Sequence, residues 1–293
     1  MHPAPSIIAF TVLSGLGLGL LSFLGLGLVQ ATGWAAFWWF GLGYGLSVAG
    51  LSLSALHLGR PERALKAFTQ WRTSWLSREA VLAVAALLFM APHAAGLVFF
   101  ATPLTGFGIV GAFLCLQTVL ATAMIYAQLK TVPRWDHWLT PLLFLTAALT
   151  GGALLIGAPR LAQVLLAVLA LVMVAYWLVG DTRLRASGST IGSATGLGAR
   201  GTVRQLEPPH TGPNYLLREM VYVVGRKHAL KLRVIALVLA VIVPSLALWA
   251  APDALVAKVL AVLAHLLGML TARWLFFAEA EHVVGLYYGK RAV

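Results

Sequence analysis

Long runs of apolar residues dominate the chain, and short segments rich in Gly, Pro, Thr and Asp separate them. The runs have the length of membrane-spanning helices and lack the alternation typical of barrel strands. We therefore predict an all-α bundle of eight transmembrane helices that forms a single membrane domain over residues 1–293. The predicted spans are 6–29, 34–57, 79–100, 105–129, 137–157, 160–180, 233–252 and 254–278.

Composition supports lipid as the solvent of this chain. Hydrophobic residues make up 60% of it and charged residues only 10%, whereas soluble proteins carry roughly 25% charged residues. The single cysteine, Cys115, lies in an apolar run, which excludes an internal disulfide and a cysteine-held metal cluster. No basic segment precedes the first apolar run, so we expect a retained helix rather than a cleaved signal peptide.

The positive charges are distributed unevenly between the two sides of the predicted bundle. Two long connections, 58–78 and 181–232, carry most of the Lys and Arg residues, whereas the opposite side has only Arg160 and Lys258. Because Lys and Arg collect in cytoplasmic loops, we expect both termini and both long loops in the cytoplasm. The net charge of +12 is then explained by topology, and we expect no nucleic-acid partner.

The densest polar segment lies between the second and third predicted helices. Its candidate residues for binding a quinone and transferring protons are His57, Arg60, Arg63, Trp71, Ser74, Arg78 and Glu79. A quinol releases two protons with its two electrons, so its site needs a proton acceptor near water. His57 and Glu79 are candidate acceptors, and an arginine would stabilise a developing quinolate. The alternative is a solvated cytoplasmic loop with snorkelling arginines.

This segment resembles a known family. His-Leu-Gly-x-Pro-x-Arg-Ala at 57–64 and Trp-Arg-x-Ser-Trp-Leu-Ser-Arg-Glu at 71–79 are similar to the membrane anchor subunit of the DMSO reductase type. The 206–220 segment adds to the match, and its residues His210, Asn214, Tyr215 and Arg218 are candidates for partner docking. The resemblance implies an eight-helix anchor with a quinone site near His57 and Glu79, and with no chemistry on the terminal substrate.

The resemblance also implies partners and a location. An iron–sulfur subunit and a molybdopterin catalytic subunit would complete the complex, in the inner membrane of a bacterium. Because both matched loops are predicted on the cytoplasmic side, we favour quinone-linked sulfite oxidation. An anchor of a DMSO or related S- or N-oxide reductase that oxidises menaquinol is the alternative. A secondary transporter and a lipid-modifying or scaffolding protein are further alternatives. The quinone is ubiquinone or menaquinone.

Two histidines lie within predicted spans. His93 is in the middle of the third helix and His265 in the middle of the eighth, at similar depths. Ionisable groups at such depth rarely face lipid. The pair is open to three interpretations: hydrogen bonds between helices, a proton relay, and ligation of a haem b. Anchors of the resembled family are generally haem-free, so we do not favour haem.

Overall fold

A computed structural model describes residues 2–57, 61–207, 212, 214–221 and 227–289, without the side chains of residues 56, 57 and 61–64. The described part is helical and contains no strand. Seven helical segments in it are long and apolar enough to cross a membrane. They are α1 (Pro5–Gly25), α2 (Gly33–Leu53), α3 (Trp75–Phe100), α4 (Thr105–Ala127), α6 (Pro159–Ala186), the segment Ala229–Ala250 and α12 (Leu255–Ala278).

One further apolar helix, α5 (Leu139–Leu155), has 17 residues, fewer than the about 20 that a typical bilayer core requires. The expectation of a polytopic all-α protein is thus confirmed, while the count of eight spans stays a prediction that depends on α5. Shorter elements occupy the connections and the chain end. They are η1 (Ser54–His57), η2 (Pro61–Phe68), α7 (Ile191–Thr195), η3 (Gly198–Arg200), α8 (Tyr215–Glu219) and α13 (Val284–Tyr287).

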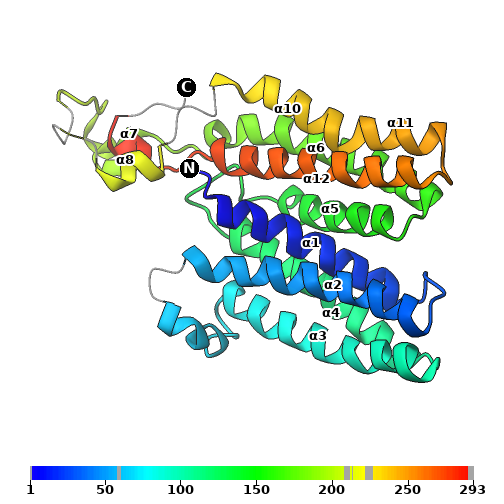
Figure 1. Cartoon of the computed structure of the whole chain (residues 1–293). Coiled ribbons are helices and arrows are strands. Elements are labelled where there is room, and N and C mark those ends of the chain that lie inside the picture. The colour runs from blue at the N-terminus through cyan, green and yellow to red at the C-terminus, as the bar shows by residue number, and fades with distance from the viewer. Residues whose placement is uncertain (1, 58–60, 208–211, 213, 222–226, 290–293) are drawn as a thin grey trace.

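The long helices lie side by side, with α1 in the middle of the bundle (Figure 1). Helix α1 contacts α2, α4, α5 and α12. Its most apolar stretch is 78% buried, whereas the corresponding stretches of the other candidate spans are 28–50% buried. The elements α7, α8 and η2 and the start of α1 lie at one end of the bundle (Figure 1). We call this end the loop end.

Glycines allow α1 to approach its neighbours closely. A Cβ added to Gly152 on α5 would meet the backbone of Gly19, and one on Gly50 of α2 would lie 2.9 Å from the Cα of Ser14. Helices in membranes commonly associate through such small residues, because lipid supplies no hydrophobic drive between helices. Large apolar side chains such as Leu171 and Phe113 point outward instead, with exposures of 72% and 60%.

The segment Ala229–Ala250 is divided into α10 (Ala229–Leu237), a π-helical turn (Val238–Ile242, labelled η4) and α11 (Val243–Ala250). Pro244 is the second residue of α11, two positions after the π-helical turn ends at Ile242. Proline has no N–H to donate to the carbonyl four residues earlier, which is that of Ala240, and a π-turn is one way for a helix to absorb this loss. The Ala240 carbonyl is therefore available to a side chain, and Nδ1 of His265 lies 2.8 Å from it.

Two helix boundaries differ from expectation in ways that affect function. Helix α3 begins at Trp75 rather than at residue 79, so Glu79 lies one turn inside the helix. Helix α6 continues to Ala186 instead of ending near 180, so Asp181 is a helical residue. Hydropathy underestimated both helices because their terminal turns contain polar residues that are fixed by tertiary contacts.

Candidate functional site

The chain before α3 folds back over the start of that helix. The hydroxyl of Ser77 donates a hydrogen bond to the carbonyl of Ala67, and the backbone N–H of Gln70 donates to the same hydroxyl at 3.1 Å. Ser77 is buried beneath this segment. One serine therefore joins the end of η2 to the first turn of α3 and fixes the connection between them.

Arg78 also fixes this connection, which we call the Trp71–Arg78 segment. Its guanidinium donates to the carbonyls of Trp71 at 3.0 Å and Arg72 at 2.7 Å. It also lies 4.3 Å from the ring centroid of Trp75, a distance typical of a cation–π contact. Ser74 precedes the helix in an extended conformation, without a side-chain cap. Of the predicted site residues, Trp71 and Arg78 are thus in contact, and Ser74 lies between them in the chain.

Glu79 points the other way, into the bundle, and is only 4% exposed. Its Oε1 lies 2.5 Å from the hydroxyl of Thr122 on α4, and that hydroxyl also lies 3.0 Å from the carbonyl of Thr118. A threonine hydroxyl has a single hydrogen. Thr122 therefore donates either to an ionised Glu79 or to Thr118, in which case a protonated Glu79 donates to Thr122. The hydrogen bond between Glu79 and Thr122 can therefore form in both protonation states of Glu79.

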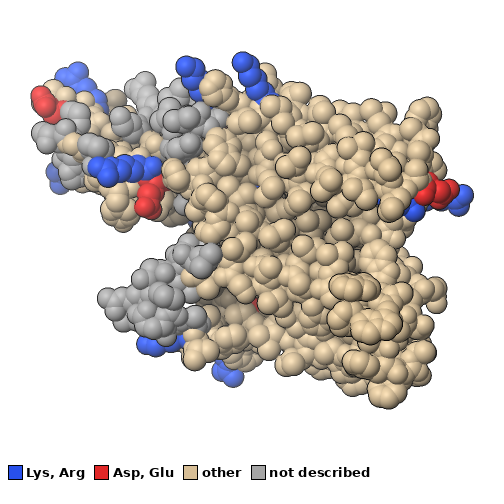
Figure 2. All heavy atoms as spheres, viewed as in Figure 1, with Lys and Arg blue, Asp and Glu red and all other residues tan. Residues whose placement is uncertain are grey.

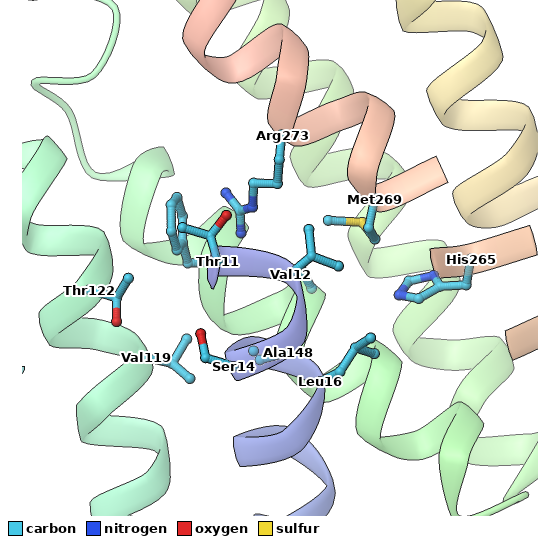
Figure 3. Close-up of a pocket in the computed structure, with 13 residues that line it drawn as sticks. Thr11, Val12, Ser14, Leu16, Val119, Thr122, Ala148, His265, Met269 and Arg273 are labelled. Atoms are coloured by element: carbon cyan, nitrogen blue, oxygen red, sulfur yellow. The ribbon is translucent and has the colours of Figure 1, made fainter. Parts of the chain in front are cut away.

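A cavity lies between α1, α4, α5 and α12, and Thr122 forms part of its wall (Figure 3). It offers about 20 Å³ to the centre of a water molecule, which exceeds the roughly 10–15 Å³ that one water needs. The polar side chains that line it are Thr11, Ser14, Thr122, His265 and Arg273. A cavity of this size with these polar side chains in its otherwise apolar wall can hold a water molecule.

Two of these residues carry polar atoms without a hydrogen-bond partner in the described part of the chain. They are Nε and Nη1 of Arg273 and Nε2 of His265; the residues are 3% and 1% exposed. The guanidinium of Arg273 lies 3.4 Å from the ring centroid of Phe144. Nδ1 of His265 contacts a carbonyl oxygen, that of Ala240, so it carries the proton and leaves Nε2 as an acceptor.

A second polar group, which we call the charge cluster, consists of Arg134, Asp181, Arg233 and Glu279. Arg233 lies 2.6 Å from Asp181 and 2.7 Å from Glu279, and Arg134 lies 2.6 Å from Asp181. Glu279 is 3% exposed, and its burial raises its pKa against the lowering effect of the two arginines. The cluster joins the ends of α6, α10 and α12 to the connection before α5.

The remaining candidate residues have different surroundings. Asn214 accepts a hydrogen bond from the backbone of Leu217 and caps α8. Tyr215 and Arg218 are exposed on α8, where a partner would find them accessible. The side chains of His57 and Arg63, and all of Arg60 and His210, lie outside the described residues.

His93 and His265 have different neighbours. The His93 ring lies 5.9 Å from that of Phe40 on α2 and borders Gly108 on α4, whereas His265 borders Ala240 and Gly151. Neither nitrogen of His93 has a hydrogen-bond partner within the described part of the chain. The contacts described for the two rings therefore do not bring them together as a pair.

Thr122 and Thr11 were not predicted from the sequence as site residues. Thr118, Thr122 and Tyr126 follow one another at four-residue spacing, which places them on one face of α4. That periodicity was visible in the sequence, but the partner Glu79 is 43 residues away. Nothing in the sequence alone indicated which face of α4 it would meet.

Fold and site together define a polytopic helical membrane protein with a buried carboxyl group, Glu79, and a small cavity whose wall includes the hydroxyl-bearing partner of that group, Thr122. Residues 1–289 match the family described as DMSO reductase anchor subunit (DmsC). The chain is also 32% identical to a subunit of the sulfite dehydrogenase of Allochromatium vinosum, over 98% of this chain and 99% of that protein. No solved structure matches it.

The chain belongs to the DMSO reductase anchor subunit family. It is thus a membrane anchor of the kind found in molybdoenzyme complexes, as the resemblance at 57–64 and 71–79 indicated. The match extends over nearly the whole chain, including both long connections.

Proposed function

We propose that this anchor exchanges electrons between a membrane quinone and an iron–sulfur subunit, in a three-subunit complex that oxidises sulfite in a catalytic molybdopterin subunit. The observation that carries the quinone site is the carboxyl group of Glu79, which is 4% exposed and directly follows the Trp71–Arg78 segment in the chain. It is hydrogen-bonded to a hydroxyl, that of Thr122, that can serve both of its protonation states. Reduction of a quinone consumes two protons, and a buried carboxyl group near the membrane surface is suited to deliver them.

His57, Arg60 and Arg63 complete the proposed site. They precede η2 or lie at its start in the sequence, and we assign them proton transfer and stabilisation of quinolate charge. Arg78 is fixed by two backbone carbonyls and the Trp75 ring. Its proposed role is to fix the Trp71–Arg78 segment while a quinone head group lies against Trp71.

The proposed topology has eight spans, with α5 as the eighth and both termini in the cytoplasm. The 17 residues of α5 give a helix about 25 Å long at 1.5 Å per residue, and bilayers adapt to such modest mismatch. On the face shown in Figure 2, Lys and Arg lie mainly at the loop end, and the helix flanks are almost free of charge. This distribution supports a cytoplasmic loop end in a bacterial inner membrane, where Asn214, Tyr215 and Arg218 would contact the partners.

Sulfite is favoured as the terminal substrate because the relative aligned over 98% of this chain is a subunit of a sulfite dehydrogenase. The family description favours a second candidate, the anchor of a DMSO or related reductase that oxidises menaquinol. The two candidates use the same site with opposite directions of electron flow.

Purification of the chain from its native membrane in mild detergent tests the proposal. We expect two larger subunits, molybdenum and iron to co-purify, and sulfite to reduce an artificial electron acceptor. Reduction of DMSO by an artificial donor, without sulfite oxidation, would favour the second candidate. A lone polypeptide without molybdenum or iron would contradict both.

A further inference from the structure

The bundle contains buried side chains of both charges. Among the described residues, the buried side chains with a formal charge are Glu79, Arg134, Arg273 and Glu279. Arg134 and Glu279 belong to the charge cluster, which contains two arginines and two carboxylates and is neutral by itself. The other two residues, Arg273 and Glu79, have opposite charges and form no ion pair with the cluster.

Arg273 lines the cavity directly, whereas Glu79 is connected to it through Thr122. Arg273 reaches from α12 toward Thr11 on α1, and Thr122 borders the same cavity from α4 (Figure 3). Thr122 is the residue that contacts Glu79. Tyr126, one turn further along α4, packs against Phe144, whose ring centroid lies 3.4 Å from the Arg273 guanidinium. No direct ion pair joins the two residues, so their interaction has to pass through what lies between them.

The cavity has the properties of a water site. The guanidinium supplies two donor nitrogens without partners, Nε and Nη1, and Nε2 of His265 supplies an acceptor without a partner. The hydroxyls of Thr11 and Ser14 donate to carbonyls of their own helix, at 3.1 Å and 2.6 Å, so their oxygens are left to accept. A buried water typically makes about three hydrogen bonds, and this cavity offers donors and acceptors in that number.

We propose that ordered water in this cavity connects Arg273 to Thr122 and Glu79, and that Arg273 is the distant counter-charge of the Glu79 carboxylate. Arg273 is then a positioning residue: it does not touch the quinone, but it favours the ionised form of the group that exchanges protons there. The inference extends the proposed function, because it explains how a carboxyl group in a nearly dry location can give up its proton and take it back. His265 marks the inner end of the same water site.

The charged and titratable groups near Glu79 have to be considered together. Tyr126 lies on α4, and Arg273 lies across the cavity on α12. Lys66 on η2 is exposed, so solvent screens its charge. Arg63 and Glu62 belong to η2, and their side chains lie outside the described residues. Of the described cations, Arg273 is the one that is buried and unpaired by a carboxylate, which makes its removal the most informative change.

The test is infrared spectroscopy on the intact, quinone-free complex in lipid nanodiscs. The carbonyl band of protonated Glu79 is identified by its loss in Glu79→Gln and is then titrated with pH. In Arg273→Met we expect the band to persist to a pH at least about one unit higher than in the wild type, a tenfold change in proton affinity. Arg273→Lys restores most of the difference. The matched control Thr146→Val changes a buried threonine that lies outside the cavity and leaves the titration unchanged.

An unchanged titration in an assembled Arg273→Met complex would overturn the proposal. If that variant does not assemble, Thr11→Val decides, because it removes one hydroxyl from the cavity and touches neither charged residue. A shift in the same direction then supports the water connection, and a titration identical to that of Thr146→Val overturns it. The titration is measured without quinone, so it tests the link between Arg273 and Glu79 separately from the proposed function. The link can be absent while Glu79 still exchanges protons with a quinone. The link can also be present while Glu79 exchanges its proton with another acceptor.

Discussion

Replacement of Arg233 by methionine tests the charge cluster. Arg233 is 16% exposed at its side chain and lies 2.7 Å from Glu279, which is 3% exposed. Loss of one partner from a buried pair typically costs about 3–5 kcal/mol, because the other charge stays buried. Arg134 remains 3.8 Å from Glu279 and compensates part of this. The pair with Asp181 adds little, because Asp181 is 44% exposed and such pairs contribute roughly 0–1 kcal/mol.

We therefore expect Arg233→Met to destabilise the protein by about 3 kcal/mol, which corresponds to a Tm lower by roughly 5–10 °C in a protein of this size. The assay is a thermal unfolding curve of the detergent-solubilised complex. Arg185→Met, which changes an exposed arginine near the end of the same α6, is the control and should leave the Tm unchanged. The double variant Arg233→Met with Glu279→Gln should recover more than half of the loss, because it removes the stranded carboxylate. A Tm for Arg233→Met equal to that of the control would refute the reasoning.

Two further predictions concern stability. Burial lowers the pKa of His137, whose Nδ1 accepts a hydrogen bond from the backbone of Leu139. The unfolded chain therefore binds a proton at this residue more readily than the folded chain does. The stability of the protein is thus expected to fall as the pH drops below about 6.5. His137→Asn should lose less Tm than the wild type between neutral and mildly acidic pH, and equal losses would contradict this assignment. Gly152→Val should destabilise the protein by about 1–3 kcal/mol, because a Cβ at this position meets the backbone of α1. A Cβ at Gly41 faces open space, so the control Gly41→Val should keep the wild-type unfolding curve. The same loss of stability in both variants would contradict the proposed close packing.

Hydropathy was sufficient to predict the helical membrane fold, because runs of apolar residues have few other solutions in lipid. It did not predict where α3 begins, because the first turn of that helix is polar and is held by Ser77 and Arg78. The same limitation applies to α6, whose last turn reaches beyond the apolar run to Ala186. Helix ends that depend on tertiary hydrogen bonds are not encoded in local composition.

The candidate site was predictable only in part. The family resemblance identified Glu79 and the Trp71–Arg78 segment as site candidates, and of these the structure places Trp71 and Arg78 in contact. It did not identify Thr122 as the partner of Glu79, because the contact depends on the rotation of α4 relative to α3. Arg273 and Glu279 were recognisable as unusual in or near an apolar span, but only the packing separates them: Glu279 joins the charge cluster and Arg273 faces the cavity.

The central claim is that Glu79 exchanges protons with a membrane quinone. The most direct test measures sulfite-dependent quinone reduction in membranes that contain Glu79→Gln, beside sulfite-dependent reduction of an artificial acceptor by the soluble partners. Asp253→Asn, a carboxylate-to-amide change in the connection between α11 and α12, is the control. We predict that Glu79→Gln, like His57→Ala, abolishes quinone reduction and leaves the artificial reaction intact, while the control retains both. Normal quinone reduction in Glu79→Gln would contradict the account.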